Sequence, residues 1–263
     1  MMSDFKFGVC MGFDDRERLV YAKNAGLDYF EFNFNAISRA EDAQLDDLKG
    51  FLKDIDMPCY AANGMFPGEM KLVGPEVDYS IIDEHLDKAG KRLSFLGGDT
   101  VVFGSGAARR CPDDWSYEKA TEQLVLLCRE HIAPYMKKYG LTCAIEPLRS
   151  AECNVITTAA RGYEICQLAQ VPEVKLLVDL YHFDIENEER SSILNYKGYL
   201  QHMHIASAKN NRYYPSATDG VDYKEFFDLL RRVEYNPMRI SLEGRCDNFA
   251  DEAKTVVDFL KTL

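Results

Sequence analysis

Several features that mark common protein classes are missing from this sequence of 263 residues. No apolar run approaches the roughly 18–20 residues that a membrane-spanning helix needs. No GxGxxG motif follows the first expected strand, which excludes the usual dinucleotide-binding fingerprint. The N-terminal residues MMSDFKFGVCMGF show no basic start followed by an apolar stretch, so we expect no signal peptide. Together these absences favour a cytoplasmic protein.

Positive charge is scarce relative to negative charge. The chain has 31 Lys and Arg residues against 43 Asp and Glu residues, a formal net charge of −12, and the bases are spread along the sequence. Proteins that bind nucleic acids or anionic membranes do so through clustered bases, which release counterions. We therefore expect no nucleic-acid partner and no membrane partner.

Paired cysteines are also absent. The eight cysteines form no CxxC motif, and Cys10, Cys59 and Cys143 lie in apolar, strand-like segments. Because no export signal is apparent, we expect reduced thiols and no disulfide framework.

The sequence does contain a regular alternation of short β-branched runs and longer amphipathic runs. The expected strands are residues 6–11, 29–34, 58–62, 100–104, 142–146, 174–180, 200–206 and 239–243. The expected helices lie near residues 14–25, 42–55, 78–96, 116–139, 158–169, 189–197, 222–234 and 248–262. Strict alternation implies a parallel sheet, and eight units in a chain of about 250 residues favour a closed barrel. We predict an α/β fold, a single (β/α)8 TIM barrel, in one domain of residues 1–263.

Two residues give local signals near the end of the long helix expected over residues 116–139. Pro134 lies late in it and is expected to kink it, because proline has no N–H to donate. Gly140 follows Lys137 and Lys138, an order typical of a helix C-terminus.

Polar side chains stand at the ends of the later strands. The segments TCAIEP, KLLVDLYH and RISLEG place Glu146, Asp179 and Glu243 at the ends of apolar runs. QHMHIAS places His202 and His204 on one face of a strand. Any one carboxylate could pair with a loop arginine or cap the next helix. In a barrel, however, these strand ends converge on one rim, where active sites are built.

A cation is the partner that such a group requires, because three converging carboxylates repel one another unless they are neutralised. His204 lies nearer the rim than His202, so we predict that His204 is a ligand and that His202 has a supporting or core role. The sequence thus predicts one divalent metal ion bound by four residues: Glu146, Asp179, His204 and Glu243. Oxygen ligands with one nitrogen favour Mn²⁺, with Mg²⁺, Co²⁺ and Zn²⁺ as alternatives.

At these residues the sequence resembles the xylose isomerase-like TIM barrel superfamily, in its sugar phosphate isomerase/epimerase branch. The segment IEPLRSAECN resembles the family pattern of a ligand Glu, here Glu146, followed six residues later by a substrate-contacting Glu, here Glu152. VDLYHFDIEN resembles the pattern of a ligand Asp with a His three residues on, here Asp179 and His182. HMHIAS and SLEG resemble the last two ligand segments, and the resemblance covers essentially the whole chain.

The resemblance, which is to ketose 3-epimerases and hydroxypyruvate isomerase in particular, implies an isomerase or epimerase of carbohydrate metabolism. Its substrate would be a small sugar or sugar-derived molecule, and the reaction would pass through a metal-bound enediolate. Glu146 or Glu243 would remove the proton next to the carbonyl, and the other would return one. Glu152, His182 and Arg212 would contact the substrate. A homo-oligomer is left open.

Arg149 departs from the family pattern, because many family epimerases have Asn after the Glu-Pro-Leu turn. A guanidinium at this position would suit a carboxylate or phosphate on the substrate. The alternative is that Arg149 pairs with Glu152 or is solvated. Four further bases also follow strands and could face the rim: Lys71, Arg109, Arg110 and Arg245.

Three other functions compete with this interpretation. A metal-dependent dehydratase of the inosose or dehydroshikimate type would use the same site and begin with the same proton abstraction, so the sequence does not separate it from an epimerase. A DNA-repair endonuclease of the same fold would need extra histidines after the third and fourth strands, where AANGMF and VVFGSG contain none. A non-catalytic sugar-binding protein would not need both candidate bases.

Overall fold

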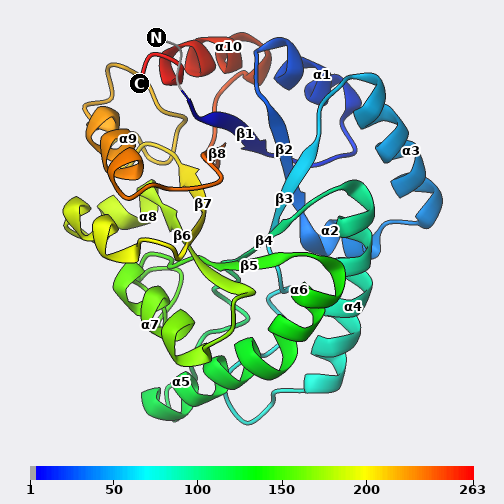
Figure 1. Cartoon of the computed structure of the whole chain (residues 1–263), viewed down its shortest axis with the longest axis vertical. Coiled ribbons are helices and arrows are strands. Elements are labelled where there is room, and N and C mark those ends of the chain that lie inside the picture. The colour runs from blue at the N-terminus through cyan, green and yellow to red at the C-terminus, as the bar shows by residue number, and fades with distance from the viewer. Residues whose placement is uncertain (1–3) are drawn as a thin grey trace.

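The structure, a computed structural model, describes residues 4–263. Over these residues eight parallel strands close into a barrel in sequence order, with the last strand paired to the first (Figure 1). The strands are β1 (Lys6–Cys10), β2 (Tyr29–Asn33), β3 (Cys59–Asn63), β4 (Thr100–Phe103), β5 (Thr142–Ile145), β6 (Val174–Asp179), β7 (Leu200–Ile205) and β8 (Arg239–Leu242). The predicted α/β TIM barrel is confirmed, and every predicted strand agrees within one residue at each end.

The prediction of one domain covers residues 1–263, of which residues 1–3 lie outside the described part of the chain; it stays a prediction. All eight cysteines lie within the described residues and are free, as predicted. Among residues 4–263 no helix has both the length and the apolar character needed to cross a bilayer.

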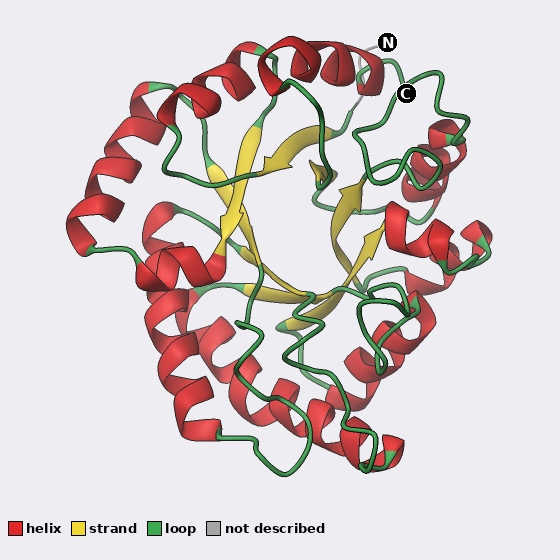
Figure 2. Cartoon of the chain, turned by 180° about the vertical axis from the view of Figure 1, so that it is seen from behind, coloured by secondary structure: helices red, strands yellow, loops and turns green. Residues whose placement is uncertain are grey.

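Helices surround the strands, so that Figure 2 shows an inner ring of strands and an outer ring of helices. They are α1 (Arg16–Asn24), α2 (Phe34–Arg39), α3 (Asp42–Asp54), α4 (Tyr79–Leu96), α5 (Tyr117–Leu126), α6 (Ala133–Tyr139), α7 (Ala159–Ala169), α8 (Leu180–Ile185), α9 (Tyr223–Arg232) and α10 (Phe249–Leu260). A π-helix, η1 (Leu127–Ile132), and a 3-10 helix, η2 (Arg190–Tyr196), complete the set over the described residues. The helix expected near residues 189–197 is therefore the 3-10 helix, and α2 and α8 were not predicted.

The long helix expected over residues 116–139 is interrupted before Pro134. Because Pro134 has no N–H, the α-helical hydrogen-bond pattern cannot continue through it. The chain instead forms η1, and the N–H of Ala133 donates to the carbonyl of Cys128, five residues back. The helix then ends at Gly140 in the left-handed conformation, with φ 67°, as the sequence predicts.

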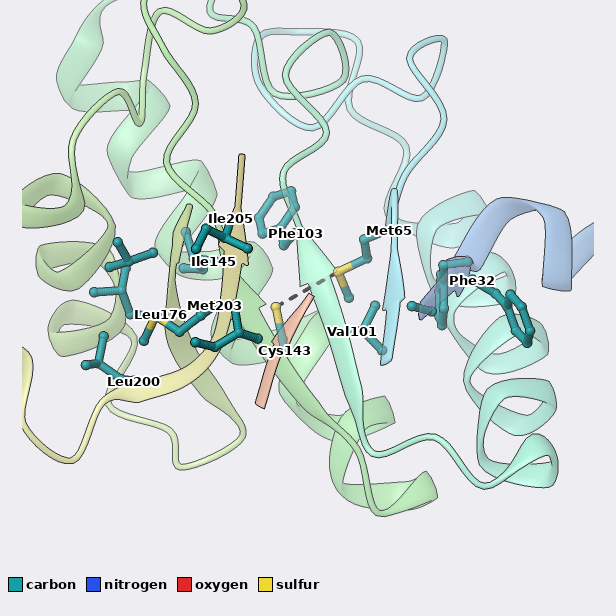
Figure 3. Close-up of a cluster of buried hydrophobic side chains, with 14 of the residues drawn as sticks. Phe32, Met65, Val101, Phe103, Cys143, Ile145, Leu176, Leu200, Met203 and Ile205 are labelled. Atoms are coloured by element: carbon teal, nitrogen blue, oxygen red, sulfur yellow. Dashed lines mark hydrogen bonds between the residues drawn. The ribbon is translucent and has the colours of Figure 1, made fainter. Parts of the chain in front are cut away.

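Hydrophobic side chains pack in two separate layers, because successive residues of a strand point to opposite faces. Val101 and Phe103 of β4 belong to the large cluster that joins the strands to the helices, part of which is drawn in Figure 3. Val102, between them, instead joins Ala144 and Leu177 in a small cluster contributed by β4, β5 and β6. This small apolar cluster fills only part of the barrel interior, because the fully buried residues Glu31, His202 and Ser241 of β2, β7 and β8 are polar.

Candidate metal centre and active site

The four predicted metal ligands meet at the C-terminal ends of the strands. Glu146 directly follows β5, Asp179 ends β6, His204 lies in β7 and Glu243 directly follows β8. Each offers one ligand atom, and these atoms all lie within 4.8 Å of one another. The barrel therefore brings together residues that are far apart in the sequence, at the rim where the sequence analysis expects them. That they bind a metal ion stays a prediction.

His204 lies at the centre of this group. Its Nδ1 atom is 3.2 Å from Oε1 of Glu146 and 3.2 Å from Oε2 of Glu243. Its other ring nitrogen, Nε2, is 2.9 Å from Oε1 of Glu31. Because the ring is fully buried, both nitrogens depend on these carboxylates for partners.

Asp179 contributes a buried oxygen that lacks a donor. Its Oδ1 atom accepts a hydrogen bond from the backbone N–H of Tyr181 at 2.8 Å, which caps α8. Its Oδ2 atom is buried and has no hydrogen-bond partner among the residues described, although a guanidinium nitrogen of Arg212 lies 3.5 Å away. An orphaned carboxylate oxygen is costly unless a cation meets it. This oxygen, two further carboxylates and one imidazole form a donor set that fits a hard divalent cation.

The carboxylates of the site are buried close to one another, and this changes their pKa values. Burial, together with Glu243 and Glu146, raises the pKa of Asp179 to about 8. Burial and the Glu243 carboxylate also raise the pKa of Glu146. Burial alone would raise the pKa of Glu243 as well, but His204 and Arg212 lower it to about 2. A divalent cation among these groups would relieve the repulsion between them.

His182, predicted to contact the substrate, is a buried neutral imidazole. Its Nδ1 accepts a hydrogen bond from the backbone N–H of Arg149 at 3.2 Å, so the ring proton is carried on Nε2. Nε2 lies 3.5 Å from Oδ2 of Asp179. Burial and the nearby Arg212 guanidinium lower the pKa of His182 to about 3, which keeps the ring uncharged at neutral pH.

The other three predicted substrate residues form a chain of ion pairs beside the ligands. Arg212 lies 2.5 Å from Oε2 of Glu243 and 4.0 Å from Oε1 of Glu152. The same oxygen of Glu152 accepts a hydrogen bond from Nε of Arg149 at 2.6 Å. Both guanidinium groups lie over the ring of Tyr181, at 4.9 Å for Arg212 and 5.5 Å for Arg149. Arg212 and Glu152 therefore lie beside the four ligands, and Arg149 is held by Glu152.

Two of the other bases that follow strands are engaged by backbone carbonyls. Arg109 is fully buried and donates to the carbonyl oxygens of Phe103, at 2.8 Å, and Glu146, at 2.6 Å. Arg109 therefore holds the ends of β4 and β5 together, and these hydrogen bonds engage the guanidinium that the sequence analysis offered for a substrate anion. Arg245 donates to the carbonyl of Asn211 through two of its nitrogens.

Glu31 is a site residue that the sequence analysis missed. It lies in the middle of β2, is fully buried, and contacts both His202 and His204. The signal that could identify it is the one that identifies Glu146, a charged residue within an apolar run. Asn63, the last residue of β3, was also missed; its Nδ2 donates to Oε1 of Glu243 at 3.4 Å.

Gly104, directly after β4, leaves room for Glu146. A Cβ atom added at Gly104 would lie 2.3 Å from Oε2 of Glu146. We expect Gly104→Ala to displace this carboxylate and to lower kcat/KM by roughly 100-fold, the effect of a displacement of about 1 Å at an active site. Gly12→Ala is the matched control, because a Cβ there meets nothing within 4 Å. Equal kinetics for the two variants would contradict the role given to this gap.

One family model and two known sugar epimerases match this chain in sequence. The family model described as xylose isomerase-like TIM barrel matches residues 19–263. The chain is 26% identical to an L-ribulose 3-epimerase of Methylomonas sp. (strain DH-1), over 84% of this chain and 75% of that protein. It is 24% identical to 3-dehydro-D-guloside 4-epimerase of Escherichia coli (strain K12), over 87% of this chain and 86% of that protein. These relatives are sugar epimerases, which supports an isomerase or epimerase and does not favour the dehydratase alternative.

A solved structure shows the same fold over the full length. The D-allulose 3-epimerase from Methylomonas sp. in complex with D-allulose superposes with a TM-score of 0.83 at 21% sequence identity. The alignment covers 100% of this chain and 99% of that one. The resemblance inferred from the strand-end motifs is thus confirmed at the level of family and fold.

Proposed function

The chain belongs to the xylose isomerase-like TIM barrel family, and on that premise we propose that it is a divalent-metal-dependent isomerase or epimerase of a small keto sugar. The reaction would remove a proton from the carbon next to a carbonyl group and return one. One observation carries the proposal: Glu146 and Glu243, from strands separated by two others, both lie 3.2 Å from Nδ1 of His204. Two candidate bases thus face one site.

The cation would be held by Glu146, Asp179, His204 and Glu243, whose ligand atoms already lie within 4.8 Å of one another. When bound, it would polarise the substrate carbonyl and stabilise the negative charge that develops on the carbonyl oxygen. Mn²⁺ is the expected ion, because three carboxylates and one imidazole form a mainly hard ligand set.

Glu146 and Glu243 would transfer the proton. One carboxylate removes the proton from one face of the substrate carbon, and the other delivers a proton to the opposite face, which inverts that carbon. The number of protons on substrate and enzyme together does not change. The neutral His182 and the carboxylate of Glu152 would contact substrate hydroxyl groups. If they also move a proton between substrate oxygens, the product is the aldose–ketose isomer.

The ion pair between Arg149 and Glu152 supports a neutral sugar as the substrate. The Arg149 guanidinium already binds the Glu152 carboxylate at 2.6 Å. Fewer of its N–H donors are therefore free to bind a carboxylate or phosphate on the substrate. We therefore expect neutral ketoses to be turned over in preference to sugar acids and sugar phosphates.

An isotope experiment tests the proposal directly. The Mn²⁺-loaded protein is incubated in D₂O with neutral ketoses, keto sugar acids, inososes and sugar phosphates, and the products are recovered free of metal for NMR. We expect deuterium next to the carbonyl of a neutral ketose and appearance of its epimer or isomer. A product that has lost a hydroxyl group would instead identify a dehydratase. No exchange with any compound, together with no metal uptake, would overturn the proposal.

A further inference from the structure

Glu31 is a carboxylate in the interior of the barrel, and the strand that carries it explains why. Phe30 and Phe32, on either side of it, belong to the large hydrophobic cluster that joins the strands to the helices. Their rings stack with their centroids 5.4 Å apart. Because successive strand residues point to opposite faces, Glu31 points into the barrel. It is fully buried, so its charge is tolerated only where hydrogen-bond donors meet it.

Both oxygens of Glu31 form hydrogen bonds with imidazoles from β7. Nε2 of His202 lies 2.7 Å from Oε2, and Nε2 of His204 lies 2.9 Å from Oε1. An ionised carboxylate only accepts hydrogen bonds, so each Nε2 atom donates its proton. A neutral His204 then carries its lone pair on Nδ1, the nitrogen that faces Glu146 and Glu243 at 3.2 Å.

We propose that Glu31 is a positioning residue for the metal centre; this inference rests on the proposed function. By accepting the Nε2 proton of His204, Glu31 selects the tautomer whose Nδ1 is free for the cation, orients the ring and makes Nδ1 a stronger donor. His202 binds the second oxygen of Glu31 and so restrains the carboxylate from turning away from His204. Glu31 acts through His204 and does not touch the cation.

A second group of candidate ligands tests this assignment. Cys10, Glu31 and His204 also lie close enough together to hold an ion, and Sγ of Cys10 is 4.0 Å from Nε2 of His204. A cation there would have to displace the proton that His204 donates to Glu31. The four-residue group offers one more ligand, and it contains the orphaned Oδ2 of Asp179. The geometry therefore favours a cation on the Nδ1 side of His204.

The experiment measures Mn²⁺ affinity by titration calorimetry for the wild type and for Glu31→Gln. Glutamine keeps the shape but removes the charge and one acceptor, so we expect the dissociation constant to rise roughly 10–100-fold. Two controls are Cys10→Ser, which alters the second group, and Ser241→Ala, which removes a buried hydroxyl 3.1 Å from Nε2 of His202. Both are expected to bind Mn²⁺ as the wild type does.

The outcomes separate the two levels of inference. A wild type that binds no Mn²⁺ overturns the proposed function itself. A wild type that binds Mn²⁺ while Glu31→Gln binds it equally well overturns only the positioning role of Glu31. Weakening by Cys10→Ser to the same extent as by Glu31→Gln would place the ion in the second group, which also overturns that role.

A spectroscopic measurement keeps the inference testable even if Glu31→Gln does not fold. The chain has only five histidines, so their ¹⁵N resonances can be assigned by single substitutions. In the wild type loaded with diamagnetic Zn²⁺, we expect His204 to carry its proton on Nε2 and to show a metal-bound Nδ1. Where Glu31→Gln folds, that Nε2 proton is expected to exchange faster with water. A His204 proton found on Nδ1 would overturn the proposal.

Discussion

Replacing Glu243 by glutamine, or Glu146 by glutamine, is expected to lower kcat for epimerisation by about 10²–10⁴-fold, the usual contribution of a positioned general base. An amide cannot take the substrate proton. Each variant retains one of the two carboxylates that lie 3.2 Å from His204. That remaining base is expected to exchange the proton of one epimer with D₂O without inverting the carbon. Steady-state kinetics and NMR in D₂O measure the two effects separately.

The control for this prediction separates proton transfer from metal binding, because both glutamates are also predicted ligands. Asp179→Asn removes a ligand charge but no candidate base, and an asparagine can still accept the hydrogen bond from the Tyr181 N–H. At saturating Mn²⁺ we expect Asp179→Asn to recover part of its epimerisation activity, whereas kcat for epimerisation by both glutamine variants should stay as low as without the added Mn²⁺. Recovery of near wild-type epimerisation by Glu146→Gln or Glu243→Gln would refute its role as a base.

Removing divalent cations with a chelator is expected to abolish turnover and to lower the melting temperature. An ion present at about 100 times its Kd stabilises the folded state by about 2.7 kcal/mol. For a chain of this size that corresponds to a loss of roughly 5–10 °C when the ion is removed. Differential scanning calorimetry with and without Mn²⁺ checks the shift, and readdition of Mn²⁺ should restore both activity and stability.

The stabilisation by metal is expected to grow as the pH rises. Burial and the neighbouring carboxylates raise the pKa of Asp179 from an ordinary value of 3.8 to about 8 in the folded protein. Between these values the metal-free folded state binds more protons than the unfolded state, so its stability falls with rising pH. Burial alone would lower the pKa of His204, but the Glu31 and Glu243 carboxylates raise it well above its ordinary value. The stability that protonated His204 gives the metal-free folded state is therefore also lost as the pH rises.

Binding a cation displaces these protons, so its affinity should rise by up to about tenfold per pH unit for each proton displaced. The Mn²⁺-dependent change in melting temperature should therefore be larger near pH 8 than near pH 5.5. Glu243 differs from Asp179, because its pKa in the folded protein is lowered to about 2. The stability that ionised Glu243 contributes is lost only as the pH falls toward that value, well below the range from pH 5.5 to pH 8. A metal-dependent shift that shrinks toward pH 8 would contradict the assignment of these carboxylates to the site.

Much of this fold could be predicted from the sequence, because strands and amphipathic helices leave local patterns. The elements that could not be predicted are those without such a pattern. The helix α2 begins at Phe34, directly after β2, and α8 begins at Leu180, directly after β6, so no turn residue separates strand from helix. The interruption before Pro134 takes the form of a π-helix, which a hydrophobic period of 3.6 residues does not distinguish from an α-helix.

The sequence by itself determined which residues are candidates for the site. Glu146, Asp179 and Glu243 each end an apolar run, and a buried charge in such a run requires a partner whatever the fold around it. The closed barrel then decided which partner each has. It paired Arg149 with Glu152, bound Arg109 to the backbone carbonyl of Glu146, and placed Glu31 of β2 against His204 of β7, 173 residues later. Such pairings depend on strand order and on the direction of each side chain, which only barrel closure sets.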